Sequence, residues 1–196
     1  MREGRITFKQ YRSIDIALFT ALFVVSEAVV TLAANKWFPG QPYTFSLLIV
    51  FMCLMMMRWG LLVGITAPLG SLAFCICSGA DGNQYLIYIV GNLFSLLAFF
   101  YIMIRGKDKI RSDALRTGLF VILTFVFTQA GRWLVAVLLG NDPLIFITFV
   151  STDALSGVFA LIAVLSARHI DGLFEDQKAY LFRLDRERKE KAKEES

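Results

Sequence analysis

Long apolar runs separated by short polar breaks constrain the fold of this chain more than any other feature of its sequence. The runs cover residues 14–34, 43–57, 61–79, 85–104, 117–139 and 144–167. About 20 apolar residues in a helix are enough to cross a bilayer. Hydrophobic residues make up 57% of the chain, above the roughly 45–50% of a soluble domain. The pattern predicts an all-α polytopic membrane protein with six transmembrane helices.

The charged residues gather at the start of the chain, in one central loop and in the tail. Basic residues precede the first apolar run, as in a signal peptide, but that run is too long to be one and we expect a retained helix. Residues 1–170 are predicted to form one membrane domain. Residues 171–196 are predicted to form a charged cytoplasmic tail, helical because opposite charges stand four residues apart.

The placement of lysine and arginine predicts the orientation of the helices. If the N-terminus is inside, 18 of the 20 basic residues lie in inner segments, and the outer loops at 35–42, 80–84 and 140–143 hold only Lys36. Inner loops of membrane proteins carry an excess of such residues. We therefore expect a multi-pass protein of the cell membrane with both termini cytoplasmic.

Strongly polar residues interrupt four of the six runs, where burying a charge costs about 2.5–3.5 kcal/mol. With a rise of 1.5 Å per residue, all of them fall roughly 10–15 Å below the outer surface. We expect no comparable layer in the inner half. The candidate substrate-binding residues are those of this layer and one neighbouring aromatic: Glu27, Asn92, Gln129, Arg132, Trp133 and Asp153.

Two interpretations of this layer remain open at the level of sequence. The polar residues could form an internal salt-bridge network that fixes the bundle, or they could line a pocket for a small solute. Arg132 would suit a carboxylate-bearing ligand, whereas Glu27 and Asp153 would suit an amine. A zwitterionic or heteroaromatic compound would satisfy both.

Catalysis is not expected, because the sequence contains no recognisable catalytic or nucleotide-binding motif. The single histidine, His169, follows the last apolar run and is far in depth from the acidic residues. The three cysteines lie within apolar runs, where packing is their commonest role. We expect no metal, no cofactor and, because acidic residues balance the basic tail, no nucleic-acid partner.

Small residues recur every four positions near the start of the first run, at Ser13, Ala17 and Ala21. Such faces let helices approach closely. The segments IALFTALFVVSEAV (16–29) and YTFSLLIVFMCLMMMRWGLLVGITAPLGSL (43–72), together with the six-helix layout, resemble the substrate-specific S components of energy-coupling factor (ECF) transporters. Ala17 and Ala21 match the AxxxA motif of that family.

The resemblance implies a binding subunit that captures a vitamin or related micronutrient from outside. It would deliver this ligand with a T component, which the Ala17 and Ala21 face would contact, and two ATPase subunits. The loop at 35–42 would gate the site, and helices four to six would supply Asn92, Gln129, Arg132, Trp133 and Asp153. Glu27 has no counterpart that the resemblance assigns.

Two other classes of function remain as alternatives. A structural or scaffolding membrane protein of the cell-shape type would need only the internal salt-bridge network, with the charged tail as its interaction surface. A stand-alone transporter is less favoured, because the sequence has no clear inverted repeat to support alternating access.

Overall fold

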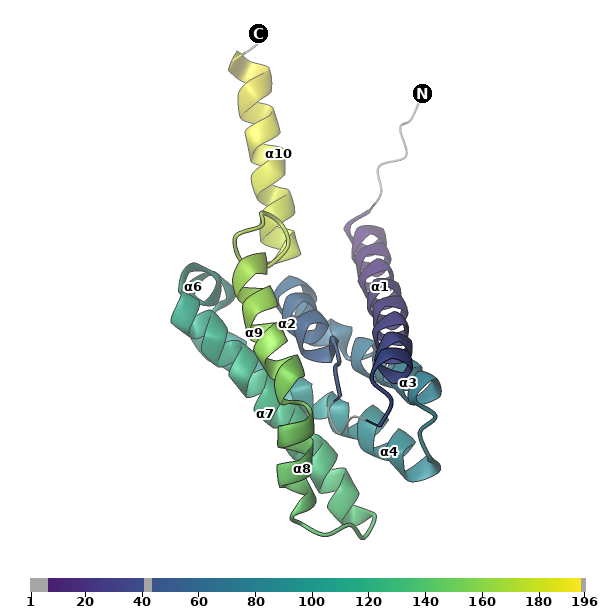
Figure 1. Cartoon of the computed structure of the whole chain (residues 1–196). Helices are drawn as coiled ribbons and strands as arrows, with labels where there is room; N and C mark the ends of the chain where they lie inside the picture. Colours follow the sequence, from purple (N-terminus) through teal and green to yellow (C-terminus); the bar gives the residue numbers. More distant parts are fainter. Residues whose placement is uncertain (1–6, 41–43, 195–196) are drawn as a thin grey trace.

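The computed structural model of the chain is built from helices and the turns between them (Figure 1). It describes residues 7–40 and 44–194, without the side chains of 188 and 191–194, and no strand occurs within these ranges. The end of the loop expected at 35–42 and the first position of the helix expected at 43–57 lie outside the described residues, as do both extreme ends of the chain.

The helices follow the expected apolar runs, with breaks that the runs did not reveal. In chain order they are α1 (Phe8–Trp37), α2 (Leu48–Trp59), η1 (Gly60–Val63), α3 (Thr66–Ser78), α4 (Gly82–Gly91), η2 (Asn92–Ala98), α5 (Phe99–Arg105), α6 (Lys107–Ser112), α7 (Ala114–Leu138), α8 (Ile145–Thr152), α9 (Ala154–Ala167) and α10 (Gln177–Glu194). Here α4, η2 and α5 form one continuous helical segment, Gly82–Arg105.

Between three and five of these segments are long and apolar enough to cross a membrane. Three qualify directly: α1, the segment Gly82–Arg105, and α7. Two further spans arise if each bent pair counts as one, the pair α2 and α3 with a bend of 117° and the pair α8 and α9 with a bend of 46°. The architecture therefore fits a membrane protein, while the sixth span remains a prediction.

The centre of the bundle is α2, which is enclosed on all sides. Eleven of its twelve residues are buried, including the consecutive Met55, Met56 and Met57. A helix that is apolar around its whole circumference belongs inside a protein or a membrane. Its 12 residues span only about 18 Å, so α2 is better suited to filling this core than to crossing a bilayer alone.

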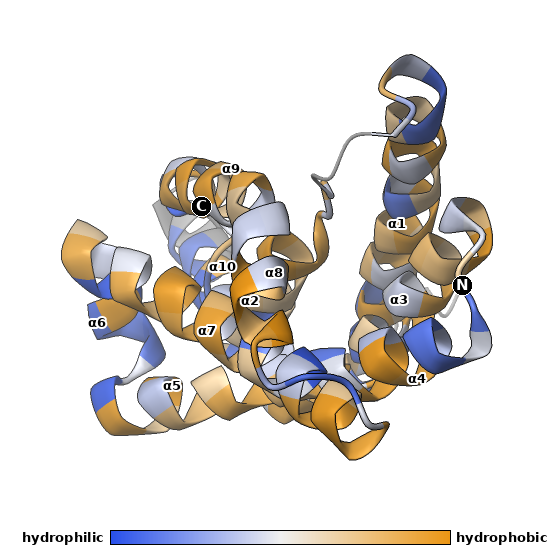
Figure 2. Ribbon diagram, turned by 60° about the horizontal axis from the view of Figure 1, so that its bottom comes forward, coloured by the Kyte–Doolittle hydropathy of each residue, from blue (hydrophilic) through white to orange (hydrophobic). Residues whose placement is uncertain are grey.

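The outer faces of α1, α7 and α9 are apolar and exposed, whereas α6 and α10 are hydrophilic (Figure 2). On α1 the exposed residues include Leu18 and Leu22, as well as the small Ala17 and Ala21. The small-residue face of α1 is therefore not used to pack the protein's own bundle.

The charged tail forms α10, which projects from the same end of the molecule as the start of α1 (Figure 1). Its base is held by ion pairs from Lys107 to Asp176 at 2.6 Å and from Arg111 to Glu175. Arg183 pairs with Asp171 at 2.6 Å. The segment 107–112 and the base of the tail are thus joined through opposite charges.

These contacts shift the acidity of the tail carboxyl groups. The hydrogen bond from Arg183 holds the pKa of Asp171 below its ordinary value. Partial burial raises the pKa of Asp176, but hydrogen bonds from Lys107 and the backbone of Ala179 outweigh it, so the net shift is also downward. Both carboxyl groups therefore stay ionised while the tail is docked.

Candidate functional site

Arg132 of α7 is the centre of the polar layer and is 4% exposed. Its Nε donates to Oδ1 of Asn92 at 2.6 Å. Its Nη1 donates to Oδ2 of Asp153 at 2.8 Å and to Oε1 of Gln129 at 3.4 Å. The guanidinium also lies 4.8 Å from the ring centroid of Tyr88. The structure therefore brings these four predicted residues together around one buried cation.

Asp153 stands at the bend between α8 and α9 and is 1% exposed. Besides Arg132, its Oδ2 accepts from Nε2 of Gln129 at 2.7 Å. Its Oδ1 accepts from the hydroxyl groups of Ser156 at 2.5 Å and of Thr44 at 3.4 Å. With an arginine and three neutral donors, this carboxylate is compensated for its burial, as a buried charge must be.

Glycines next to the polar residues explain how three helices approach this closely. A Cβ on Gly91 would lie 2.6 Å from Cα of Arg132, and one on Gly131 would lie 2.2 Å from the carbonyl oxygen of Gly91. The backbones of α4 and α7 are therefore in contact at this crossing. This contact places Asn92, the residue after Gly91, beside Arg132.

On α3 the same arrangement occurs at Gly70, where a Cβ would lie 1.8 Å from the ring of Phe23. The ring of Phe23 therefore occupies the space above Gly70. The next residue, Ser71, accepts a hydrogen bond from Nδ2 of Asn92 at 2.6 Å. The network thus extends from α7 through the segment 82–105 to α3.

Glu27, unlike the other predicted acidic residue Asp153, does not pair with Arg132. It is 1% exposed, and its Oε2 accepts from the backbone N–H of Leu47 at 2.8 Å, at the N-terminus of α2. A carboxylate is favourable at that end of a helix. Within the described residues Glu27 takes part in no ion pair.

A small cavity of about 10 Å³ lies between these groups. Its lining includes Glu27, Ser71, Tyr88, Arg132 and Asp153. A space of this size holds about one water molecule, whereas pockets for drug-sized ligands measure about 300–1,000 Å³. In this structure the polar site is therefore formed but closed around a water-sized space.

Trp133 does not join the site. Its Nε1 donates to the carbonyl oxygen of Pro143 at 2.9 Å, and its ring meets that of Phe146 at 6.1 Å, edge on. Consecutive residues of a helix point about 100° apart, so a side chain next to Arg132 cannot share its direction. The structure thus places Trp133 at the α7–α8 turn and not around the cavity, and its role in ligand binding stays a prediction.

The half of the molecule that carries the tail, which was expected to face inward and to hold no polar layer, contains a second buried polar cluster, the inner cluster. Asp15 of α1 accepts from Arg58 at 2.7 and 3.0 Å and from the indole Nε1 of Trp59 at 2.5 Å. Arg58 also donates to the carbonyl oxygens of Gly172 and Leu173, directly before the tail helix. Arg58 is therefore a buried partner of Asp15 on α1.

The two carboxylates of α1 bracket the central helix. Glu27 contacts the residue before α2, and Asp15 contacts its last two residues, Arg58 and Trp59. Twelve residues separate Asp15 from Glu27, a rise of about 18 Å, and α2 has twelve residues and the same length. The matched spacing holds the antiparallel helices α1 and α2 together at both ends.

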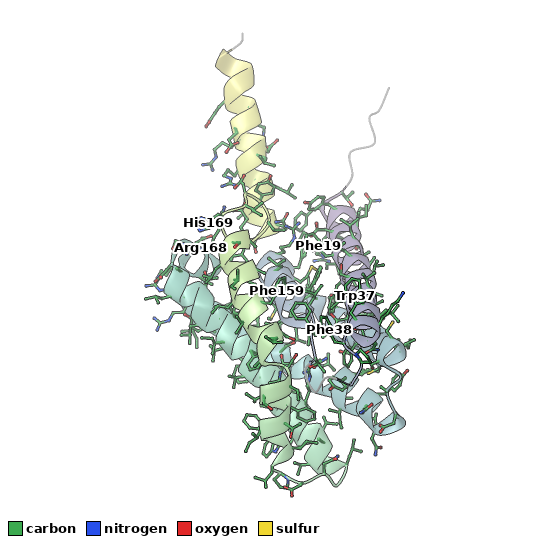
Figure 3. The ribbon with its side chains drawn as sticks, in the orientation of Figure 1. Phe19, Trp37, Phe38, Phe159, Arg168 and His169 are labelled. Carbon is green, nitrogen blue, oxygen red and sulfur yellow. The ribbon has the colours of Figure 1, made fainter. Side chains whose placement is uncertain are left out.

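The chemistry available at the site is charge pairing and hydrogen bonding. In the part of the chain that the structure describes, no three His, Cys, Asp or Glu residues are placed to hold a metal ion. His169 lies beside Arg168 at the end of α9, on the side of the tail helix and away from the polar site (Figure 3).

Comparison of the chain with family models, curated protein sequences and solved structures finds no match.

Proposed function

We propose that this protein is the substrate-binding S component of an ECF-type importer. In this role it captures a vitamin or related micronutrient from outside and delivers it together with a T component and two ATPase subunits. It is a multi-pass protein of the cell membrane with both termini cytoplasmic, and it is a binding protein and not an enzyme.

The observation that carries the proposal is the convergence of polar groups from several helices on one buried cavity. Glu27, Asn92, Arg132 and Asp153 come from α1, η2, α7 and the α8–α9 bend and line the same space. Ionisable residues inside membrane bundles are costly and mark binding or transport sites by default. A cavity framed by such residues supports a binding role.

The free face of α1 supports the second half of the proposal, docking on a partner. Ala17 and Ala21 are exposed and lie near the end of α1 that is opposite Glu27. Small residues spaced by four allow a second helix to approach closely in a membrane. Within the described residues, the protein's own helices leave this face exposed, so it is available to a T component.

Co-purification with the T component and the ATPases tests this proposal. The double variant Ala17→Trp, Ala21→Trp places two large rings on the docking face, and we expect it to lose most of the associated subunits. Leu18→Trp, Leu22→Trp is the matched control, because these residues are exposed on the same turns of α1 but point in another direction. Equal recovery of partners with both variants would count against the docking face.

A scaffolding role is the second candidate, and one observation favours it. Asp153 and Arg132 already satisfy one another with help from Gln129 and Asn92. A network of this kind can fix a bundle without any ligand. Under this alternative the tail is the interaction surface, so removal of residues 175–196 would abolish function, whereas an S component would tolerate it better.

A further inference from the structure

The ionisable groups around the cavity do not balance in charge. Its lining contains one arginine, Arg132, and two carboxylates, Glu27 and Asp153. Arg132 is paired with Asp153 at 2.8 Å, and its Nε is taken by Asn92. The sequence-based assignment of Arg132 to a carboxylate-bearing ligand therefore has little support, because that cation already has its anion inside the protein.

Glu27 is the carboxylate that remains. Among the described residues it is hydrogen-bonded to the Leu47 backbone and to the Ser46 side chain, and no basic side chain forms an ion pair with it. A buried carboxylate is strongly destabilising unless an opposite charge accompanies it. A buried carboxyl group is accommodated either by protonation or by a nearby cation, and a cation placed in the 10 Å³ cavity would lie beside Glu27.

The shape and walls of the cavity agree with such a group. An ammonium-type nitrogen is about as large as the one water molecule that the space admits. Phe74 and Tyr88 flank the cavity with their ring centroids 4.9 Å apart, and aromatic faces attract cations; the Tyr88 ring already receives the Arg132 guanidinium. The cavity therefore suits the charged head of a ligand and leaves no room for its remainder.

A larger apolar groove lies next to the cavity. It measures about 710 Å³, and Thr44 borders both spaces. Val30 and Ala34 line it and continue the α1 face of Glu27 at helical spacing. The Thr44 hydroxyl between the two spaces is held only by long hydrogen bonds of 3.4 and 3.5 Å.

Aromatic side chains form much of the remaining groove wall. Trp37 and Phe38, at the end of α1, and Phe45, before α2, line it, and the ring of Phe45 packs edge on against Phe159 of α9 at 5.1 Å. Figure 3 shows Trp37, Phe38 and Phe159 in the region between α1 and α9. This wall suits an apolar or aromatic body.

We propose that the ligand is a small organic cation with an apolar body, whose protonated nitrogen pairs with Glu27 while its body lies in the groove beyond Thr44. This inference rests on the proposed binding function and specifies its substrate class. It predicts that ligand binding neutralises the single unpaired carboxylate of the polar layer and leaves the Arg132–Asp153 pair intact.

Thermal unfolding of the purified full-length protein in detergent tests the charge of the ligand. The probe is a small-molecule cell extract that is separated by ion exchange at neutral pH into cationic, neutral and anionic pools. We expect the cationic pool to raise the melting temperature by several degrees, as a saturating ligand does. Mass spectrometry of the denatured, ligand-loaded protein then identifies the bound compound.

Two variants locate the interaction. Glu27→Gln retains an acceptor for the Leu47 N–H but removes the charge, and we expect it to bind the cationic compound about 10–100-fold more weakly, the effect of one hydrogen bond to a charged group. Thr31→Val is the control, because Thr31 is buried one turn further along α1 and its hydroxyl has no partner in the described part of the chain. This variant should bind as the wild type does.

The outcomes separate this inference from the function on which it rests. Stabilisation by the neutral or anionic pool alone, or equal binding by Glu27→Gln, overturns the cationic class but leaves a binding subunit. If no pool stabilises the wild type and no compound is released on denaturation, the binding function itself fails. The comparison of pools on the wild-type protein remains decisive even where Glu27→Gln does not fold.

Discussion

The buried pair of Arg132 and Asp153 provides the sharpest test of the polar layer, through a double-mutant cycle. Arg132→Met removes the cation but leaves the Asp153 carboxylate with the weaker donors Gln129, Ser156 and Thr44. Breaking a buried ion pair on one side costs about 3–5 kcal/mol. Asp153→Asn keeps an oxygen acceptor for Arg132 but leaves the buried guanidinium without its anion, so we expect a loss of similar size, about 3–5 kcal/mol.

The double variant Arg132→Met, Asp153→Asn buries no net charge at this position. Its loss of stability should therefore be smaller than the sum of the two single losses by about 1.5–3 kcal/mol, the range for directly interacting residues. The same cycle on Lys107 and Asp176, a less buried pair at the base of the tail, is the control and should give less than about 1 kcal/mol.

Unfolding of the full-length protein in mixed micelles, by a rising fraction of SDS and with tryptophan fluorescence as the signal, measures these energies. Arg132→Lys, which retains the charge but not the planar fork, replaces Arg132→Met if the latter does not accumulate. Additive losses at Arg132 and Asp153, within about 0.5 kcal/mol, would refute the direct pairing from which the layer is built.

Three further predictions concern the helix crossing, the tail and the inner cluster. Gly131→Ala forces a Cβ to within 2.2 Å of the Gly91 carbonyl oxygen. We expect this variant to lose at least about 1–3 kcal/mol of stability in the same SDS titration. If it were as stable as the wild type, the close contact of α4 and α7 would be contradicted. The pKa values of Asp171 and Asp176 are lowered in the folded protein, so we expect α10 to stay docked from about pH 8 to 5. The stabilisation from a lowered carboxyl pKa is lost only as the pH falls through the folded-state pKa, below about pH 4. Hydrogen exchange of the α10 amides measures docking, and release of α10 near neutral pH would disprove the prediction. Asp15→Asn leaves the buried arginine of α2 without its anion, and we expect faster proteolysis of the tail; an unchanged rate would show that the inner cluster does not support the tail.

The depth of the polar layer could be predicted from the sequence, because the rise of an α-helix fixes how far along a span each residue lies. Glu27, Asn92, Arg132 and Asp153 were expected at one level, and the structure places them around one cavity. Depth alone does not give the direction in which each side chain points around the helix axis. Trp133 shares the depth of the site but points to the α7–α8 turn, so the structure separates it from the residues around the cavity.

The inner cluster was missed because its members lie at the ends of apolar runs. Asp15 follows a basic flank and Arg58 stands two residues before Gly60, and such positions are commonly solvated. Arg58 is covered by Asp15 of α1 and by the segment before α10, to whose carbonyl oxygens, those of Gly172 and Leu173, it donates. That contact spans more than a hundred residues, and no local pattern indicates it.

One signal in the sequence could have indicated that Ser71 belongs to the polar network. A glycine directly precedes a polar residue inside three helical segments, at Gly70–Ser71, Gly91–Asn92 and Gly131–Arg132. Each glycine allows a neighbouring ring or backbone to approach, which brings the next side chain into contact with another helix. The pairing of a small residue with a polar one is more informative here than either residue alone.

The contacts at both ends of α2 determine how α1 can move. A shift of α1 along its axis by one turn, about 5.4 Å, would break the Glu27 contact with Leu47 and the Asp15 contact with Arg58 at the same time. The two helices therefore resist sliding along one another, and we expect α1 and α2 to move together as one rigid body. A change at Glu27 would then tilt α1 and α2 together and so reorient the face of Ala17, without any change in the length or register of the two helices.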